Sequence, residues 1–108
     1  MFTGYFIVTP SSPIIISAIP QSSTAIQLSW KPGFDGHSSI TGYKVEMKKL
    51  NEVYIVLAEN LLVMSYTVRN LDPYTTYLFR ISARNAIGVS PGANTSNTTL
   101  QDGESIRI

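Results

Sequence analysis

The sequence predicts an all-β fold in which seven short strands form a two-layered sandwich. Hydrophobic and polar residues alternate with a period of two in several segments. Further β-branched or aromatic runs lie between these segments, and turn residues separate them at short intervals. No stretch carries a helical period long enough to indicate a helix. Seven strands at this spacing favour a sandwich over a parallel sheet.

Alternation predicts the second, third and sixth strands, because one face of each is apolar and the other polar. Short β-branched or aromatic runs predict the first, fourth and fifth. The last segment is rich in Ser, Thr and Asn, with strand propensity but little to bury, as expected of an edge strand. The predicted strands are 14–18, 26–30, 43–48, 53–57, 66–68, 77–84 and 93–100.

Proline and glycine mark the ends of these strands. Pro13 and Pro20 flank the first strand, where the missing N–H of proline is tolerated. The segments 32–36, 71–73 and 85–92 combine Pro, Gly, Asp and Asn, and we predict that they are loops.

A chain of 108 residues corresponds to one domain. We expect residues 10–100 to form it, with 1–9 as a leader or tail of a preceding element and 101–108 as an exit segment toward a next domain. The apolar start lacks the basic region of a signal peptide. No apolar run approaches the roughly 20 residues that span a membrane.

Composition argues against several classes of function. The chain has no cysteine, which excludes disulfides and thiolate metal sites, and a single histidine, His37, argues against the usual zinc ligand sets. Asp35 and Ser38 lie beside His37, but residues of one loop do not make an oriented catalytic triad. A net charge of +1 with 14% charged residues argues against a nucleic-acid partner. We therefore expect no enzymatic activity and no cofactor.

One ordered set of residues extends over most of the chain. It consists of Trp30, Pro32, Asp35-Gly36, Ile40 to Val45, Leu71 to Tyr77, Phe79 to Ile81, Ala83, Asn85, Gly88, Ser90 and Pro91. In this order and spacing the set resembles the fibronectin type III domain over about residues 10–100. The resemblance implies an immunoglobulin-like β-sandwich of seven strands. Asn70 stands where the family often has glycine, and asparagine tolerates a positive φ.

Five residues make up the predicted structural core. Trp30 offers the largest apolar surface in the chain, and we expect it to fill the central slot between the sheets. Tyr77 stands where such sandwiches place a tyrosine corner, whose hydroxyl bonds to the backbone near the preceding turn. Tyr43, Leu71 and Phe79 complete the core.

The resemblance also implies a function. Similar domains occur in receptor tyrosine phosphatases and neural adhesion molecules, so we expect a non-enzymatic interaction and spacer module in the extracellular part of a cell-adhesion or receptor protein. The alternative is an intracellular structural module of a titin-like muscle protein, because those proteins share the patterns at 35–36, 40–43 and 79–85. A cytokine-receptor module fits less well, because paired cysteines and a Trp-Ser-x-Trp-Ser box are missing.

The loop 84–92 excludes one mode of adhesion. Some members of the family carry Arg-Gly-Asp here, whereas this chain has Ile87-Gly88-Val89. Both charged residues that would engage an integrin are absent.

Four cations form a candidate interaction surface, the basic strip. Alternation places Lys44 and Lys48 on the outer face of 43–48, and Arg80 and Arg84 on the outer face of 77–84. These strands are neighbours in the fold that the resemblance implies. The strip suits a sulfated polysaccharide or an acidic surface of another cell-surface or matrix protein. An ordinary solvated face is the alternative. Neighbouring domains of the same chain are further expected partners, and we expect the isolated domain to be monomeric.

Two consecutive acceptor motifs for N-glycosylation lie on the last predicted strand. Asn94-Thr95-Ser96 and Asn97-Thr98-Thr99 make Asn94 and Asn97 candidate sites. Both motifs favour an extracellular location.

Overall fold

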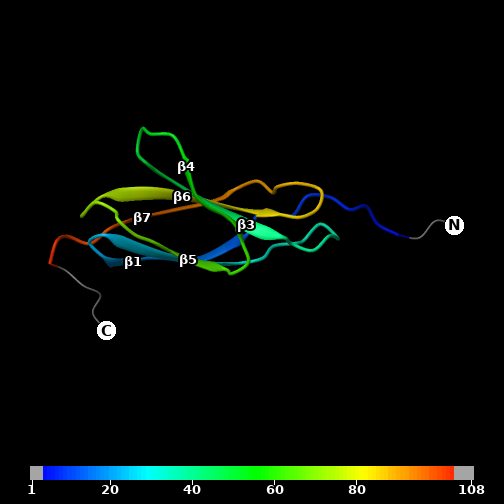
Figure 1. The fold of residues 1–108 in the computed structure, drawn as a ribbon, viewed down its shortest axis with the longest axis horizontal. Helices are drawn as coiled ribbons and strands as arrows, with labels where there is room; N and C mark the ends of the chain where they lie inside the picture. Colours follow the sequence, from blue (N-terminus) through cyan, green and yellow to red (C-terminus); the bar gives the residue numbers. More distant parts are fainter. Residues whose placement is uncertain (1–3, 104–108) are drawn as a thin grey trace.

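The chain forms two antiparallel sheets packed face to face (Figure 1). The computed structural model describes residues 4–103. The three-stranded sheet has the order β1-β2-β5, with β1 at Ile14–Ser22, β2 at Ala25–Lys31 and β5 at Ser65–Val68. The four-stranded sheet has the order β4-β3-β6-β7, with β4 at Ile55–Leu61, β3 at Gly42–Lys49, β6 at Thr76–Arg84 and β7 at Ala93–Thr98. The predicted seven-stranded sandwich is confirmed.

The first strand is longer than predicted. β1 continues to Ser22, so Pro20 lies within the strand and does not flank it. Proline is tolerated here because β1 is an edge strand and its register on β2 shifts between Pro20 and Ser22.

The fourth strand is displaced along the sequence. β4 begins at Ile55, two residues after the predicted start, and extends to Leu61. Its pairing with β3 is irregular on both sides of Val45. Such irregularities insert an extra residue on one strand and break the simple alternation that the prediction used.

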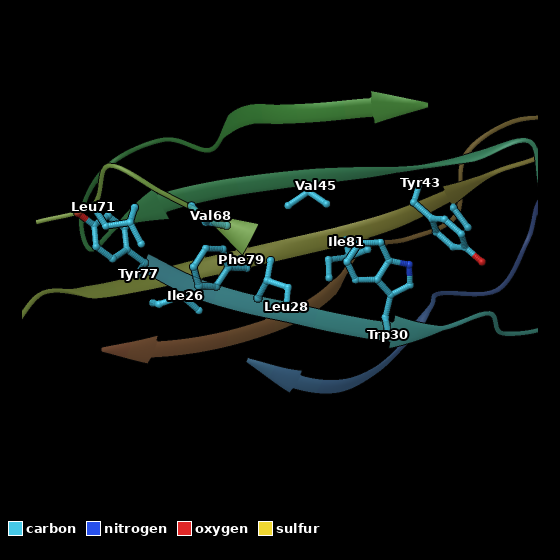
Figure 2. Packing of buried hydrophobic residues seen from close by; sticks show 11 residues of the cluster. Ile26, Leu28, Trp30, Tyr43, Val45, Val68, Leu71, Tyr77, Phe79 and Ile81 are labelled. Atoms are coloured by element: carbon cyan, nitrogen blue, oxygen red, sulfur yellow. The ribbon is translucent and has the colours of Figure 1, made fainter. Parts of the chain in front are cut away.

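The core lies between the two sheets (Figure 2). Ile26, Leu28 and Trp30 project into it from β2, because apolar residues two apart share one face of a strand. Only 2% of Trp30 is exposed, and its ring meets Tyr43 edge-on with the centroids 5.6 Å apart. Phe79 comes from β6 on the opposite sheet and is fully buried.

Several hydrogen bonds stabilise the turn before β6. Asn70 has a φ of 62°, in the left-handed region that asparagine tolerates. The N–H of Asp72 donates to the hydroxyl of Tyr77 at 2.9 Å, which is the geometry of a tyrosine corner. The hydroxyl of Thr99 donates to the carbonyl of Asp72 at 2.6 Å and accepts from the N–H of Thr75 at 2.9 Å. Leu71 and Tyr77 are buried beside this turn (Figure 2).

The described chain enters and leaves at opposite ends of the sandwich (Figure 1). At the entry end, the N–H of Ser11 donates to the carbonyl of Phe34 at 2.9 Å. At the exit end, the N–H of Leu100 donates to the carbonyl of Ser22 at 3.2 Å. Among residues 4–103 there is no helix that could cross a membrane.

Candidate interaction surfaces

The four cations of the basic strip lie on the outer face of the four-stranded sheet. Side chains two residues apart on a strand share a face, and the register of β3 on β6 brings the outward residues of both strands together. The outward cross-strand pairs are Gly42–Arg84, Lys44–Ser82, Glu46–Arg80 and Lys48–Leu78.

An ion pair occupies the middle of the basic strip. The Nε and Nη2 atoms of Arg80 donate to the two carboxylate oxygens of Glu46, each at 3.0 Å. These hydrogen bonds hold the pKa of Glu46 below its ordinary value, against the opposing effect of its burial. Lys44 lies 3.9 Å from the same carboxylate. The charge of Arg80 is therefore largely compensated by Glu46, which lies directly opposite it on β3.

An aromatic ring joins the strip from outside the predicted set. The guanidinium carbon of Arg80 lies 4.0 Å from the ring centroid of Tyr54, and the ammonium of Lys48 lies 5.0 Å from it. Both are within the range of cation–π attraction. Tyr54 directly precedes β4, next to β3 in the sheet, and sequence alone did not single it out. Arg84 is exposed and pairs with no acidic residue in the described part of the chain.

The two acceptor asparagines have different environments. Asn94 is exposed on β7, directly across from Arg80 on β6, and its side chain makes no hydrogen bond within residues 4–103. Asn97 is half-buried, and its amide nitrogen donates to the carbonyl of Ala18 in β1 at 2.6 Å. Glycosylation at Asn97 would require this bond between the two sheets to break, whereas Asn94 is free to be modified.

A buried asparagine organises the entry end. The amide nitrogen of Asn85 donates to the carbonyls of Val8 and Asp35, at 2.7 and 2.9 Å. Its oxygen accepts from the N–H groups of Ile87 and Gly88, at 2.9 and 3.1 Å. The Asn85 side chain thus connects the segment before β1 and the β2–β3 loop to the β6–β7 loop through four hydrogen bonds. Ile87, at the tip of that loop, is 54% exposed.

His37 is an exposed residue of the β2–β3 loop. Its ring stacks on Tyr5 with the centroids 3.8 Å apart and meets Phe34 edge-on at 4.9 Å. The carboxylate of Asp35 accepts a hydrogen bond from the backbone N–H of His37. Residues 4–103 contain no group of three or more metal-ligating side chains of the His, Cys, Asp or Glu type.

An open groove of about 570 Å³ lies near the entry end, between the β2–β3 and β4–β5 loops. Its walls include Phe34, Leu62 and Met64, which are 51%, 81% and 43% exposed. Sequence patterns did not reveal it, because these residues lie in loops where no periodicity distinguishes an apolar wall from an isolated exposed residue.

Known proteins similar to this chain are much longer. It is 34% identical over 85 residues to the Drosophila melanogaster protein named cell adhesion molecule Dscam1, which covers 75% of this chain and 4% of that protein. It is 34% identical over 100 residues to Rattus norvegicus pikachurin, covering 88% of this chain and 10% of pikachurin. The chain therefore spans a tenth or less of these relatives.

The fold and the sequence also resemble solved domains of titin. A crystal structure of domains A168–A170 of titin superposes with a TM-score of 0.76 and 29% identity, covering 86% of this chain and 33% of the titin chain. The family described as the fibronectin type III domain matches residues 10–99. The protein therefore belongs to the fibronectin type III family, and its described structure is a single module of that kind.

Proposed function

We propose that this chain is an extracellular interaction and spacer module of a cell-adhesion or receptor protein, without enzymatic activity. Its similarity to a protein named as a cell adhesion molecule supports this function. The extracellular location rests mainly on Asn94. This asparagine belongs to an acceptor motif, is exposed on β7, and its side chain makes no hydrogen bond within residues 4–103. The spacer role is supported by entry and exit at opposite ends, which lets modules follow one another in a string (Figure 1).

The location is tested by sending the 108-residue chain through the secretory pathway of mammalian cells. We expect one N-glycan on Asn94, located by mass spectrometry before and after enzymatic deglycosylation. Ser96→Ala is the matched control, because it removes the motif of Asn94 and leaves both asparagines in place. Ser96 is exposed, so the variant should fold normally. A wild-type chain that leaves the cells without any glycan would contradict the extracellular proposal.

The second candidate function is an intracellular structural module of a titin-like muscle protein. It is favoured by the 29% identity to the titin domains, which is close to the identity with the adhesion molecule. A glycan after forced secretion shows only that Asn94 can be modified. A glycan on the protein isolated from its own tissue separates the two functions, because a module that stays in the cytoplasm never meets the glycosylation machinery. Sequence on either side of this domain separates them as well, through a signal peptide and membrane span or through further muscle-type domains.

A further inference from the structure

Asn94 has two close neighbours on the outer face of the four-stranded sheet. Its partner across β6 and β7 is Arg80, and the next outward pair along these strands is Leu78 with Ser96. Directly opposed residues lie about 4.5–5.5 Å apart, and diagonal ones about 7–8 Å. Asn94 is exposed, whereas Arg80 and Leu78 are half-buried. A group attached to Asn94 therefore begins beside these two side chains.

Arg80 offers a flat surface next to Asn94. Its guanidinium carbon lies 4.0 Å from the ring centroid of Tyr54, which supports it from one side. Glu46 compensates its charge by accepting two hydrogen bonds, and a guanidinium has further N–H donors. The Arg80 side chain is still 38% exposed. Its exposed part therefore combines a planar group, a compensated charge and free donors.

The surface of the sheet is hollowed beside Asn94. Gly92 lies two residues before Asn94, and the aliphatic part of Arg80 lies over it: a Cβ atom on Gly92 would come within 2.3 Å of Arg80 Cγ. A hollow of about 220 Å³ is found here, between β3, β6 and the start of β7, with Lys44 among its lining residues. A group on Asn94 thus has room to lie across the sheet and not only beyond its edge.

We propose that the first sugar of a glycan on Asn94 lies across the outer face of the four-stranded sheet and packs on Arg80 and Leu78. This sugar is N-acetylglucosamine, a neutral ring with CH groups on its faces and oxygens at its rim. The CH groups pack on Leu78 and on the flat guanidinium, and the rim oxygens accept from the remaining N–H donors of Arg80. The covalent link keeps the sugar next to these side chains, so weak contacts suffice to hold it.

The inference deepens the proposed function and rests on it, because N-glycans are added in the secretory pathway. It also assigns the glycan a role. A macromolecular partner would have to displace the sugar to reach Arg80, at the centre of the basic strip. The glycan thereby restricts binding through the basic strip to the unglycosylated protein.

The direct test uses the 108-residue chain secreted from isotopically labelled mammalian cells and trimmed enzymatically to a single N-acetylglucosamine. Nuclear Overhauser effects between sugar and protein protons report their contacts. We expect contacts of the sugar with Leu78 and Arg80. Ser96→Ala, which has no glycan on Asn94, is the reference for shifts of the backbone signals of these residues. A sugar that contacts neither side chain would overturn the proposal.

The contribution of Leu78 is measured by thermal unfolding. The trimmed glycoprotein should unfold about 3 °C above the unglycosylated chain from bacteria, because the sugar packs only on the folded protein. In Leu78→Ala this difference between the two forms should largely disappear, while the cost of the substitution itself cancels. Ile16→Ala is the matched control, since Ile16 is an exposed apolar residue of β1 in the other sheet, and it should keep the full difference. Equal differences in Leu78→Ala and Ile16→Ala would contradict the packing.

The covering of the basic strip is tested by amine acylation of the chain with its complete glycan. Lys48 is the cross-strand neighbour of Leu78, whereas Lys31 is exposed at the end of β2 in the other sheet. The glycan should slow acylation of Lys48 relative to Lys31, with Ser96→Ala as the unprotected reference. An unchanged ratio would show that the strip stays open.

Failure of this inference differs from failure of the proposed function. A glycan that is present on Asn94 but lies away from the sheet leaves the extracellular location intact. A secreted chain without any glycan contradicts the location itself.

Discussion

The hydroxyl of Tyr77 shows how much one atom contributes to this fold. It accepts the hydrogen bond from the N–H of Asp72, while only 3% of the residue is exposed. Tyr77→Phe keeps the ring and removes this acceptor alone. We expect a loss of about 1–2 kcal/mol in the free energy of unfolding, measured by chemical denaturation, because the Asp72 N–H loses its partner.

Tyr74→Phe is the control for this change. Tyr74 lies in the same turn but is 70% exposed, so its variant should stay within about 0.5 kcal/mol of wild type. Equal stability of both variants would mean that the corner hydrogen bond contributes nothing.

The ion pair of Glu46 and Arg80 makes stability depend on pH. The folded-state pKa of Glu46 lies below its ordinary value, so the stabilisation is fully present above the unfolded pKa, which is about 4.3 for glutamate. It is lost as the pH falls through the lower folded-state pKa. We expect Glu46→Gln to be less stable than wild type at about pH 7, with the difference shrinking below about pH 4.

Denaturation curves of both proteins between about pH 7 and about pH 2.5 measure this difference. Glu52→Gln changes an exposed carboxylate of the β3–β4 hairpin and serves as the control. A difference for Glu46→Gln that stays constant over the whole range would show that the carboxylate is not the stabilising species.

At the scale of strands, the two acceptor asparagines of β7 point to opposite faces because they are three residues apart. Asn97 therefore faces β1 and bonds to the Ala18 carbonyl, whereas Asn94 faces outward. We expect Asn97→Ala to cost about 1 kcal/mol in unfolding free energy and Asn94→Ala to cost less than about 0.5 kcal/mol. Chemical denaturation of the two variants side by side checks this, and equal losses would contradict the assignment.

Strand by strand, the sequence predicted the elements that bury one face. Apolar residues of β2 alternate with less buried ones because one side contacts the opposite sheet, and the same holds for most of β6. The bounds of β4 were misplaced for a physical reason. Ile55 and Val56 are both about half exposed, at 52% and 51%, so neighbouring residues of this edge strand do not alternate between core and solvent.

The sequence predicted on which face of the sheet the candidate surface residues lie, but not which of these residues contact one another. A period of two sufficed to place the cations of the basic strip on one face. That Arg80 pairs with Glu46 and stacks on Tyr54 depends on the register between three strands, which one sequence does not specify. The difference between Asn94 and Asn97 was readable in the sequence, because an odd separation along a strand places two residues on opposite faces.

On the scale of the whole molecule, the positions of the chain ends predict how modules follow one another. The described chain enters at one end and leaves at the other (Figure 1). A longer protein that joins this domain to its natural neighbours should be elongated in small-angle scattering and should lengthen by about one domain per module. The isolated domain should be monomeric in the same measurement. A compact tandem, or a stable dimer of the isolated domain, would contradict the spacer function.

The placement of β1 and β7 also determines how the domain responds to mechanical force. Both strands run from the entry end to the exit end: Ser12 bonds to Pro91 near their starts, and Leu100 bonds to Ser22 near their finishes. A pull on the two chain ends draws β1 toward one end and β7 toward the other, so the strands slide along each other. The contacts between them, including Asn97 with Ala18, are then loaded in shear and must fail together. In a protein that strings such modules together, tension would therefore pass along the long axis of each sandwich, and β1 and β7 would be the strands that resist it.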